Sequence, residues 1–374
     1  MLLSLALGCV LLTPSALAVD AAGGVAEVER FDEERQDDTG SPTPPSLESP
    51  QLLSQREIAT REALERGLAF LAREQAKAID GSFPKGDARE WAPVGVTALG
   101  CLAFLAGGHQ PGRGPYGKNT QRALDYLLSK ADRNPNSKTY GYIGSEGDRH
   151  SRIHGHGYAT LALAEALGMS PGNENLRGVL TQAVDRIQKS QSSEGGWGYE
   201  PIPGSFHEGS TTICVVQALR AARNAGVVVD SEIIARAVDY VSRLQAPDGT
   251  FRYQLHSEDT SVALTAAGIA TLNMAGTYDA APIQAGIDAI WRLFGTERPM
   301  KFPDYERLYL AQAFWQLTDR THFDAWWPGE LRRILSSQRA DGSWSSPAYG
   351  PAYATAVQCL VLAMPDGLLP IFQR

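Results

Sequence analysis

The sequence contains few cysteines and no cluster of Lys or Arg residues. Four cysteines occur among 374 residues, and three of them, Cys101, Cys214 and Cys359, lie outside the N-terminal leader described below. Each lies within an apolar run, and an odd number without short spacing is not typical of a disulfide framework, so we interpret them as small buried hydrophobic residues. A closed ring of helices would bring Cys101 and Cys359 together, and the sequence leaves open whether they are bridged. The net charge of −8, without a basic cluster, argues against a nucleic-acid partner.

Long apolar runs are also scarce after the N-terminus. Residues 2–18 are mostly apolar and end in Ala16-Leu17-Ala18, which is typical of a secretory signal peptide covering residues 1–18. We therefore expect export to the periplasm or another extracytoplasmic location. Residues 19–54 have few apolar side chains and are predicted to form a disordered linker. The folded domain then covers residues 55–374, and its apolar segments are shorter than the roughly 20 residues that span a bilayer. No transmembrane span is expected in the mature chain.

A short motif recurs along the predicted domain. It reads Q-x-x-x-G-x-W from Gln191 to Trp197 and again from Gln338 to Trp344. The segment from Gln245 to Phe251 keeps the spacing with Phe in place of Trp, and the segment from Gln75 to Phe83 is a looser copy. Such self-similarity indicates a repeat architecture, in which each Gly allows the chain to reverse and each aromatic fills a gap between helices.

Two kinds of helical segment alternate between these motifs. Amphipathic segments, which are typical of surface helices, cover residues 56–75, 119–130, 174–191, 231–245, 281–294 and 326–338. Almost uncharged segments, which need cover on all sides, cover residues 92–106, 155–169, 210–223, 260–275, 305–318 and 352–364. The alternation predicts an all-α protein of six outer and six inner helices, arranged as concentric layers around a central cavity.

The motifs resemble the repeats of the squalene cyclase and protein prenyltransferase β-subunit superfamily, whose fold is an (α/α)6 toroid. Three segments, His154–Glu165, Ala218–Gly226 and Leu369–Arg374, are similar to a narrower group of exported bacterial prenyltransferase/squalene-oxidase repeat proteins, whose activity is generally unassigned. The resemblance is specific for the fold and not for function. The Asp-x-Cys zinc motif of protein prenyltransferases does not occur in this sequence. Whether the protein uses a cofactor, and which one, is left open by the sequence.

The predicted toroid gathers the starting ends of the inner helices at one rim. There, His256-Ser-Glu258-Asp259-Thr260-Ser261 resembles the D-x-D-D-T-A acid motif of class II terpenoid cyclases. The resemblance implies that Glu258 is the proton donor and Asp259 its partner, with His256 in place of the first Asp. A nearby imidazolium would lower the carboxyl pKa and oppose that role. The simpler interpretation is that Asp259 or Thr260 caps the helix.

Histidines and aromatic residues form the other candidates at this rim. His154, His156, His207 and Glu208 lie at the starts of two successive inner helices and could hold a ligand or a zinc ion. Residues two apart on a helix diverge, so His154 would have to precede the first turn for both histidines to bind one ion. Hydrogen-bonding roles at the rim are the alternative. The aromatic residues Trp91 and Tyr353 could cradle an apolar ligand or a sugar, or pack in the core.

Three functions follow from these candidates. The first is an exported toroid that binds an apolar, isoprenoid-like or extended ligand in its central cavity, with or without a protein partner. The second is a terpenoid-cyclase-like enzyme that uses Glu258 and Asp259 as its acid pair. The third is a metal- or acid-dependent enzyme that acts on a cell-envelope polymer through the histidine-rich rim.

Overall fold

The computed structural model describes residues 50–149, 151–276, 280–294, 296 and 300–373. The predicted signal peptide and the predicted linker as far as residue 49 lie outside the described residues. Helix α1 begins at Pro50, ahead of the predicted domain start, so the last residues assigned to the linker are helical. From this helix onward the chain forms one compact unit.

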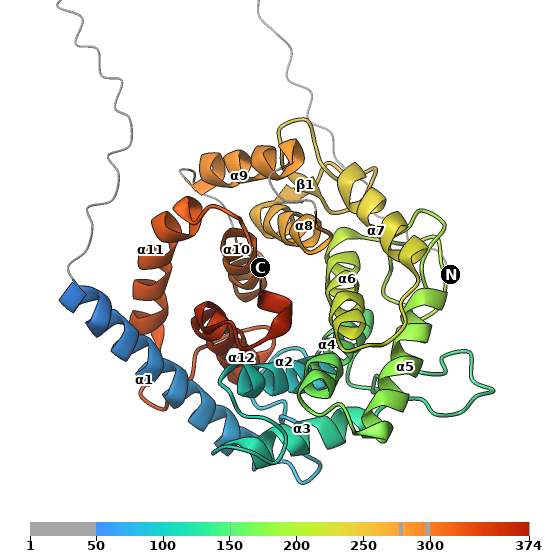
Figure 1. The fold of residues 1–374 in the computed structure, drawn as a ribbon, viewed down its shortest axis with the longest axis horizontal. Helices are drawn as coiled ribbons and strands as arrows, with labels where there is room; N and C mark the ends of the chain where they lie inside the picture. Colours follow the sequence, from blue (N-terminus) through green and yellow to red (C-terminus); the bar gives the residue numbers. More distant parts are fainter. Residues whose placement is uncertain (1–49, 150, 277–279, 295, 297–299, 374) are drawn as a thin grey trace, which may run out of the picture. The chain divides into compact units, whose positions relative to one another are not determined.

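Twelve α-helices in the described residues form two concentric rings (Figure 1). The inner ring consists of α2 (Pro93–Ala106), α4 (Arg152–Met169), α6 (Gly209–Asn224), α8 (Val262–Met274), α10 (Pro303–Trp315) and α12 (Gly350–Ala363). The outer ring consists of α1 (Pro50–Gln75), α3 (Gly117–Ser129), α5 (Glu174–Lys189), α7 (Ser231–Arg243), α9 (Ala281–Phe294) and α11 (Thr321–Ser337). Each inner helix packs against the next, and α12 packs against α2 to close the ring. The predicted all-α (α/α)6 toroid is confirmed.

The two rings differ in the side chains that they bury. All residues of α2 are buried, because inner helices contact neighbours on both sides and an outer helix behind. Helix α7 instead buries one stripe, formed by Ile233, Ala237, Tyr240 and Val241, and exposes its charged face. The boundaries predicted from the sequence differ most at α1, which begins at Pro50 and not at residue 56, and at α11, which begins at Thr321 and not at residue 326.

The repeated motif joins neighbouring outer helices. The side-chain amide of Gln191 donates hydrogen bonds to the carbonyl of Gly195 in its own motif and to the carbonyl of Ile233 in α7. Gly195 adopts a φ of +94°, and a Cβ there would lie 2.4 Å from the carbonyl oxygen of Arg236. The glycine is therefore required both for its left-handed conformation and for the close approach of the next outer helix.

The same geometry recurs at the other motifs. The amides of Gln75, Gln245 and Gln338 each donate to the Gly carbonyl of their own motif and to a carbonyl of an outer helix. The structure adds a copy that the sequence pattern does not reveal, at Gly141. Its φ is +86°, and a Cβ there would lie 2.2 Å from the carbonyl oxygen of Gln182 in α5. This copy lacks the Gln and the Trp, which explains why the pattern missed it.

The C-terminal segment closes one end of the ring. After α12 the chain passes through two 3-10 helices, η1 (Met364–Asp366) and η2 (Pro370–Phe372), and η2 packs against α6. The backbone N–H of Ile371 donates to Glu165 near the end of α4 at 3.2 Å. The indole of Trp315 donates to the carbonyl of Phe372. These contacts hold the C-terminus across the ends of the inner helices, as its central position in Figure 1 shows.

Three further features complete the fold. Two short strands, β1 (Phe251–Arg252) and β2 (Thr260–Ser261), pair in antiparallel orientation before α8, with Phe251 opposite Ser261. The cysteines on α2, α6 and α12 are buried and free, so the structure contains no bridge between Cys101 and Cys359. Among the described residues, no helix combines the length and apolar character that crossing a membrane requires.

Candidate functional site

The segments that precede five inner helices line one cavity of about 830 Å³. Its lining residues come from the starts of α2, α4, α6, α10 and α12, and the largest share comes from the loop before α6. They are Arg89, Glu90, Arg149, Arg152, Gly198, Tyr199, Glu200, Ile202, Gly204, Phe206, Phe302, Ala348 and Tyr349. The starting ends of these inner helices therefore share a mouth, which lies opposite the end that the C-terminal segment covers.

Charged side chains of both signs line this mouth. Arg89, Arg149 and Arg152 provide three positive charges, whereas Glu90 and Glu200 provide two negative ones. Arg152 forms an ion pair with Glu200, which ties the loop before α6 to the start of α4.

Arg152 also has an unusual backbone. It is a non-glycine residue with φ of +32°, at the first position of α4. Such conformations are costly and tend to occur at functional sites.

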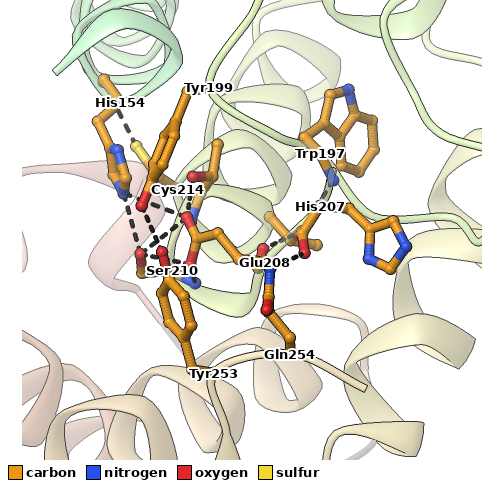
Figure 2. A network of polar contacts seen from close by, with 11 residues as sticks. His154, Trp197, Tyr199, His207, Glu208, Ser210, Cys214, Tyr253 and Gln254 are labelled. Atoms are coloured by element: carbon orange, nitrogen blue, oxygen red, sulfur yellow. Dashed lines mark hydrogen bonds and ion pairs between the residues drawn. The ribbon is translucent and has the colours of Figure 1, made fainter. Parts of the chain in front are cut away.

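Beside the cavity lies a polar cluster around Glu208, shown in Figure 2. Glu208 is fully buried and caps α6, accepting hydrogen bonds from the backbone N–H groups of Ser210 and Thr211, both at 2.7 Å. The hydroxyl of Ser210 donates to the same carboxylate at 2.7 Å. The Nε2 atom of His154 lies 3.2 Å from this hydroxyl and 3.9 Å from Glu208 Oε1. A hydrogen-bonded chain thus runs from His154 through Ser210 to Glu208.

Burial sets the protonation of this cluster. It lowers the pKa of His154 below its ordinary value, and the Glu208 carboxylate only partly opposes this shift. Burial therefore favours the neutral form of this imidazole. The cluster adjoins the cavity through Tyr199, whose ring centroid lies 6.1 Å from that of His154 and whose hydroxyl bonds to Tyr253 (Figure 2). His154 itself does not line the cavity.

The other predicted histidines point elsewhere. His156 is fully buried, and its Nδ1 accepts the backbone N–H of Ile143 at 3.0 Å. In the other motifs the backbone N–H of the motif's aromatic residue donates to a threonine hydroxyl on the following inner helix. His156 takes the place of that threonine and therefore has a structural role. His207 faces outward, with Nδ1 2.9 Å from the hydroxyl of Tyr240 on α7.

The hypothesis of a histidine metal site is not supported by this geometry. Helix α4 begins at Arg152, so His154 and His156 both lie inside its first turns and their side chains diverge. Among the residues that the structure describes, no group of three or more His, Cys, Asp or Glu side chains could hold a metal ion. Glu208 is occupied by its helix-capping hydrogen bonds.

The candidate acid motif lies on the exposed surface. His256, Glu258 and Asp259 are exposed and do not line the cavity. The carbonyl of Asp259 accepts the backbone N–H of Tyr253, which holds the segment in the turn between β1 and β2. The prediction that Asp259 or Thr260 caps the helix is wrong, because α8 begins at Val262 and Ser261 caps it through the N–H of Leu264. An acid that protonates an alkene needs enclosure from water, which this loop does not provide.

The predicted aromatic residues lie next to the cavity lining. Trp91 is 48% exposed and packs over Gly147. Tyr353 is half-buried, with its ring centroid 5.2 Å from that of Tyr349, which does line the cavity.

Sequence reasoning missed most of the lining residues. Arg149 and residues 198–206 precede α4 and α6 by three or more positions, and Arg152 begins α4 three residues ahead of the helix start that the sequence predicted at residue 155. One signal was available: the loop between Trp197 and Glu208 carries two aromatic residues, Tyr199 and Phe206.

Comparisons with known proteins agree on the fold. No protein-family model and no curated protein sequence matches the chain. Among solved structures, type II terpene cyclase MstE from Scytonema, in complex with geranylgeranyl dihydroxybenzoate, is 18% identical with a TM-score of 0.54 and covers 85% of this chain and 100% of its own. The alpha-1,6-mannanase GH76A of Salegentibacter sp. HEL1_6, in complex with alpha-1,6-mannotetrose, is 11% identical with a TM-score of 0.60. The match covers 81% of this chain and 98% of the mannanase. A D-mannose isomerase is 12% identical with a TM-score of 0.59, and the match covers 85% of this chain and 98% of the isomerase.

These similarities establish the toroid fold alone. The resemblance to terpenoid cyclase-like toroids that the repeated motifs indicate is confirmed at this level. The same fold carries a cyclase, a glycan hydrolase and a sugar isomerase, so function has to be argued from the side chains of this chain.

Proposed function

We propose that the protein binds an extended, ring-containing ligand, such as an oligosaccharide, across the cavity at the mouth of the toroid. The observation that carries the proposal is the composition of the lining, in which Tyr199, Phe206, Phe302 and Tyr349 stand beside five charged side chains. Aromatic faces pack against the apolar faces of sugar rings, while charged groups bond to their hydroxyls. A volume of about 830 Å³ accommodates several such rings.

The lumen below the mouth favours this choice over an isoprenoid. Tyr309 of α10 donates to Gln217 of α6 at 3.3 Å, and Gln217 in turn bonds to Gln312 of α10. These contacts cross the central space of the toroid, because α6 and α10 are not neighbours in the inner ring and α8 lies between them. A long hydrocarbon would therefore be confined to the mouth, where it would remove water from charged side chains without replacing their hydrogen bonds.

Ligand binding can be tested by calorimetric titration with alpha-1,6-mannotetrose, chitotetraose and tetragalacturonate, and with geranylgeranyl dihydroxybenzoate as the isoprenoid probe. We expect at least one tetrasaccharide to bind, and Phe206→Ala and Tyr349→Ala each to weaken it about tenfold, since each removes one stacking face. Ile79→Ala, which alters a fully exposed residue in the loop after α1, is the control.

The proposal fails if no tetrasaccharide binds and the isoprenoid does. Turnover of the isoprenoid that disappears in Glu258→Gln would instead support the terpenoid-cyclase hypothesis, despite the exposure of that residue.

We further propose that binding takes place outside the cytoplasm. The support is the apolar segment at residues 2–18 and the Ala16-Leu17-Ala18 sequence at its end. Expression of the full chain followed by cell fractionation and N-terminal sequencing tests this proposal. A mature protein that begins at Val19 in the extracytoplasmic fraction is expected, whereas an uncleaved cytoplasmic chain would contradict it.

A further inference from the structure

The charges of the mouth narrow the class of ligand. The chain as a whole carries a net charge of −8, yet the charged residues of the cavity lining comprise three arginines and two glutamates. The mouth is thus a locally positive region on an acidic protein, and such a region attracts anions.

Two of the arginines have no internal partner. Arg152 is paired with Glu200 and also donates from Nε to the backbone carbonyl of Arg149, but the guanidinium groups of Arg89 and Arg149 make no hydrogen bond or ion pair within the part of the chain that the structure describes. Both are exposed toward solvent. A guanidinium offers several N–H donors in a planar fork that matches a carboxylate or phosphate group.

The backbone around Arg89 adds to this positive region. The N–H of Glu90 donates to the carbonyl of Ala348 at 2.9 Å, which holds Arg89 beside the start of α12. Helix α12 has no acidic residue in its first turn, and its N-cap residue, Tyr349, makes no capping hydrogen bond. The positive end of this helix therefore faces the same cavity that Arg89 and Tyr349 line.

We propose that the ligand of this mouth is acidic, and that Arg89 and Arg149 bind carboxylate or phosphate groups carried on its sugar rings. This inference rests on the proposed function, because it specifies the chemistry of the same ligand. Aromatic residues hold the rings, and the two arginines select chains that bear anionic groups. The Arg152–Glu200 pair joins the start of α4 to the loop before α6, and this loop carries Tyr199 and Phe206, whose ring centroids lie 5.1 Å apart.

The test compares ligands that differ only in charge. Tetragalacturonate is titrated against its fully methyl-esterified form, which keeps the rings and the chain length but removes the carboxylates. Mannose 6-phosphate against mannose provides the matching phosphate pair. We expect at least one acid to bind at least about tenfold more tightly than its neutral counterpart, with an affinity that falls as salt rises. The pair that shows the difference identifies the anionic group.

Substitutions assign the effect to the two arginines. The double variant Arg89→Gln/Arg149→Gln should remove the preference for the acid, so that the acid and its neutral form bind the variant with equal affinity. An unchanged midpoint of thermal denaturation shows that the variant is folded. Arg113→Gln makes the same change of charge in an exposed residue outside the cavity and should alter neither affinity.

Two results would overturn the inference without touching the proposed function: equal binding of acid and neutral forms, or a preference for the acid that survives in the double variant. Failure of every tetrasaccharide to bind would overturn both.

Discussion

The side-chain amide of Gln338 donates a hydrogen bond to the backbone carbonyl of Ala63, a residue 275 positions earlier in the chain. The same amide donates to the carbonyl of Gly342 in its own motif at 3.0 Å. Together with the packing of α12 on α1 and α2, this pair joins the last repeat to the first helix and closes the toroid. The repeated motif, which is the clearest pattern in the sequence, therefore also provides a contact that closes the ring.

Replacement of this amide tests the closure. Gln338→Glu places an acceptor-only carboxylate against two carbonyl oxygens. The guanidinium of Arg66, which donates to Gln338 Oε1, offsets part of this repulsion, so we expect the free energy of unfolding to fall by about 1–3 kcal/mol. Gln338→Ala should cost less, because it removes the donor without adding repulsion. Urea denaturation measures both, with Gln55→Glu on the exposed surface of α1 as the control. A loss in Gln338→Glu no larger than in this control would contradict the role in closure.

Alanine substitutions at two glycines can distinguish the cost of backbone strain from the cost of a lost contact between outer helices. Gly195 and Gly226 both adopt positive φ, at +94° and +81°, but a Cβ at Gly226 would meet nothing within 4 Å. Both alanine variants carry the strain of the left-handed conformation, about 1 kcal/mol. Only Gly195→Ala also forces the carbonyl of Arg236 away, so we expect it to cost at least about 2 kcal/mol more than Gly226→Ala. Equal midpoints in thermal denaturation would show that the contact with α7 is dispensable.

His156 provides a test of its structural role. Threonine occupies the corresponding acceptor position in the other motifs, at Thr97, Thr212, Thr265 and Thr355. His156→Ala leaves the buried N–H of Ile143 without a partner and should be destabilising by about 2–4 kcal/mol. His156→Thr retains an acceptor and should recover about 1 kcal/mol of that loss. The structural role predicts that neither variant changes ligand affinity in the folded protein. A loss of affinity without a loss of stability would show that His156 takes part in ligand binding.

Glu165 makes the C-terminal closure dependent on pH. Burial raises the pKa of its carboxyl from the ordinary 4.5 to about 7, although the N–H of Ile371 partly stabilises the ionised form. The folded state then binds the proton more tightly than the unfolded state, so this group's contribution to stability is present at low pH and is lost as pH rises from about 4.5 to about 7.

Removal of the titrating group should flatten this dependence. Glu165→Gln keeps an oxygen acceptor for Ile371 and cannot ionise, so its stability relative to the natural protein should increase by on the order of 2–4 kcal/mol between pH 4 and pH 8. Denaturation curves of both proteins across that range give the difference directly. Parallel stability profiles would mean that Glu165 does not ionise within the folded protein over this range.

Local pattern was enough to predict the architecture. Helical periodicity, the absence of charge in alternate segments and the spacing from Gln to Gly to aromatic are properties of neighbouring residues, so they could be read without a structure. They predicted the twelve helices, although the start of α11 was misplaced. They did not reveal the copy of the motif at Gly141, because this copy depends on the path of the backbone and not on the identity of the residues.

The sequence predicted where the site lies in the fold but not which side chains face it. The sequence predicted that the starts of the inner helices share one rim, and residues at or before the starts of α2, α4, α6, α10 and α12 do line one cavity. The direction of each side chain was beyond the sequence. His154, His156 and His207 begin two adjacent helices, yet they turn respectively toward Ser210, toward Ile143 and toward Tyr240. A shift of one or two residues along a helix rotates a side chain by 100° or more, so small differences in where a helix begins decide which residues meet.

The sequence by itself determined that the chain forms a ring of paired helices, because burial and turn geometry are dictated residue by residue along the repeats. Only the tertiary structure decided which groups gather at the mouth. There, Arg152, Tyr199 and Phe302 come from three separate segments and share one cavity. Their meeting depends on the paths of the connecting loops, and those paths are set by contacts between residues far apart in the chain, such as the hydrogen bond from the backbone N–H of Glu90 to the carbonyl of Ala348.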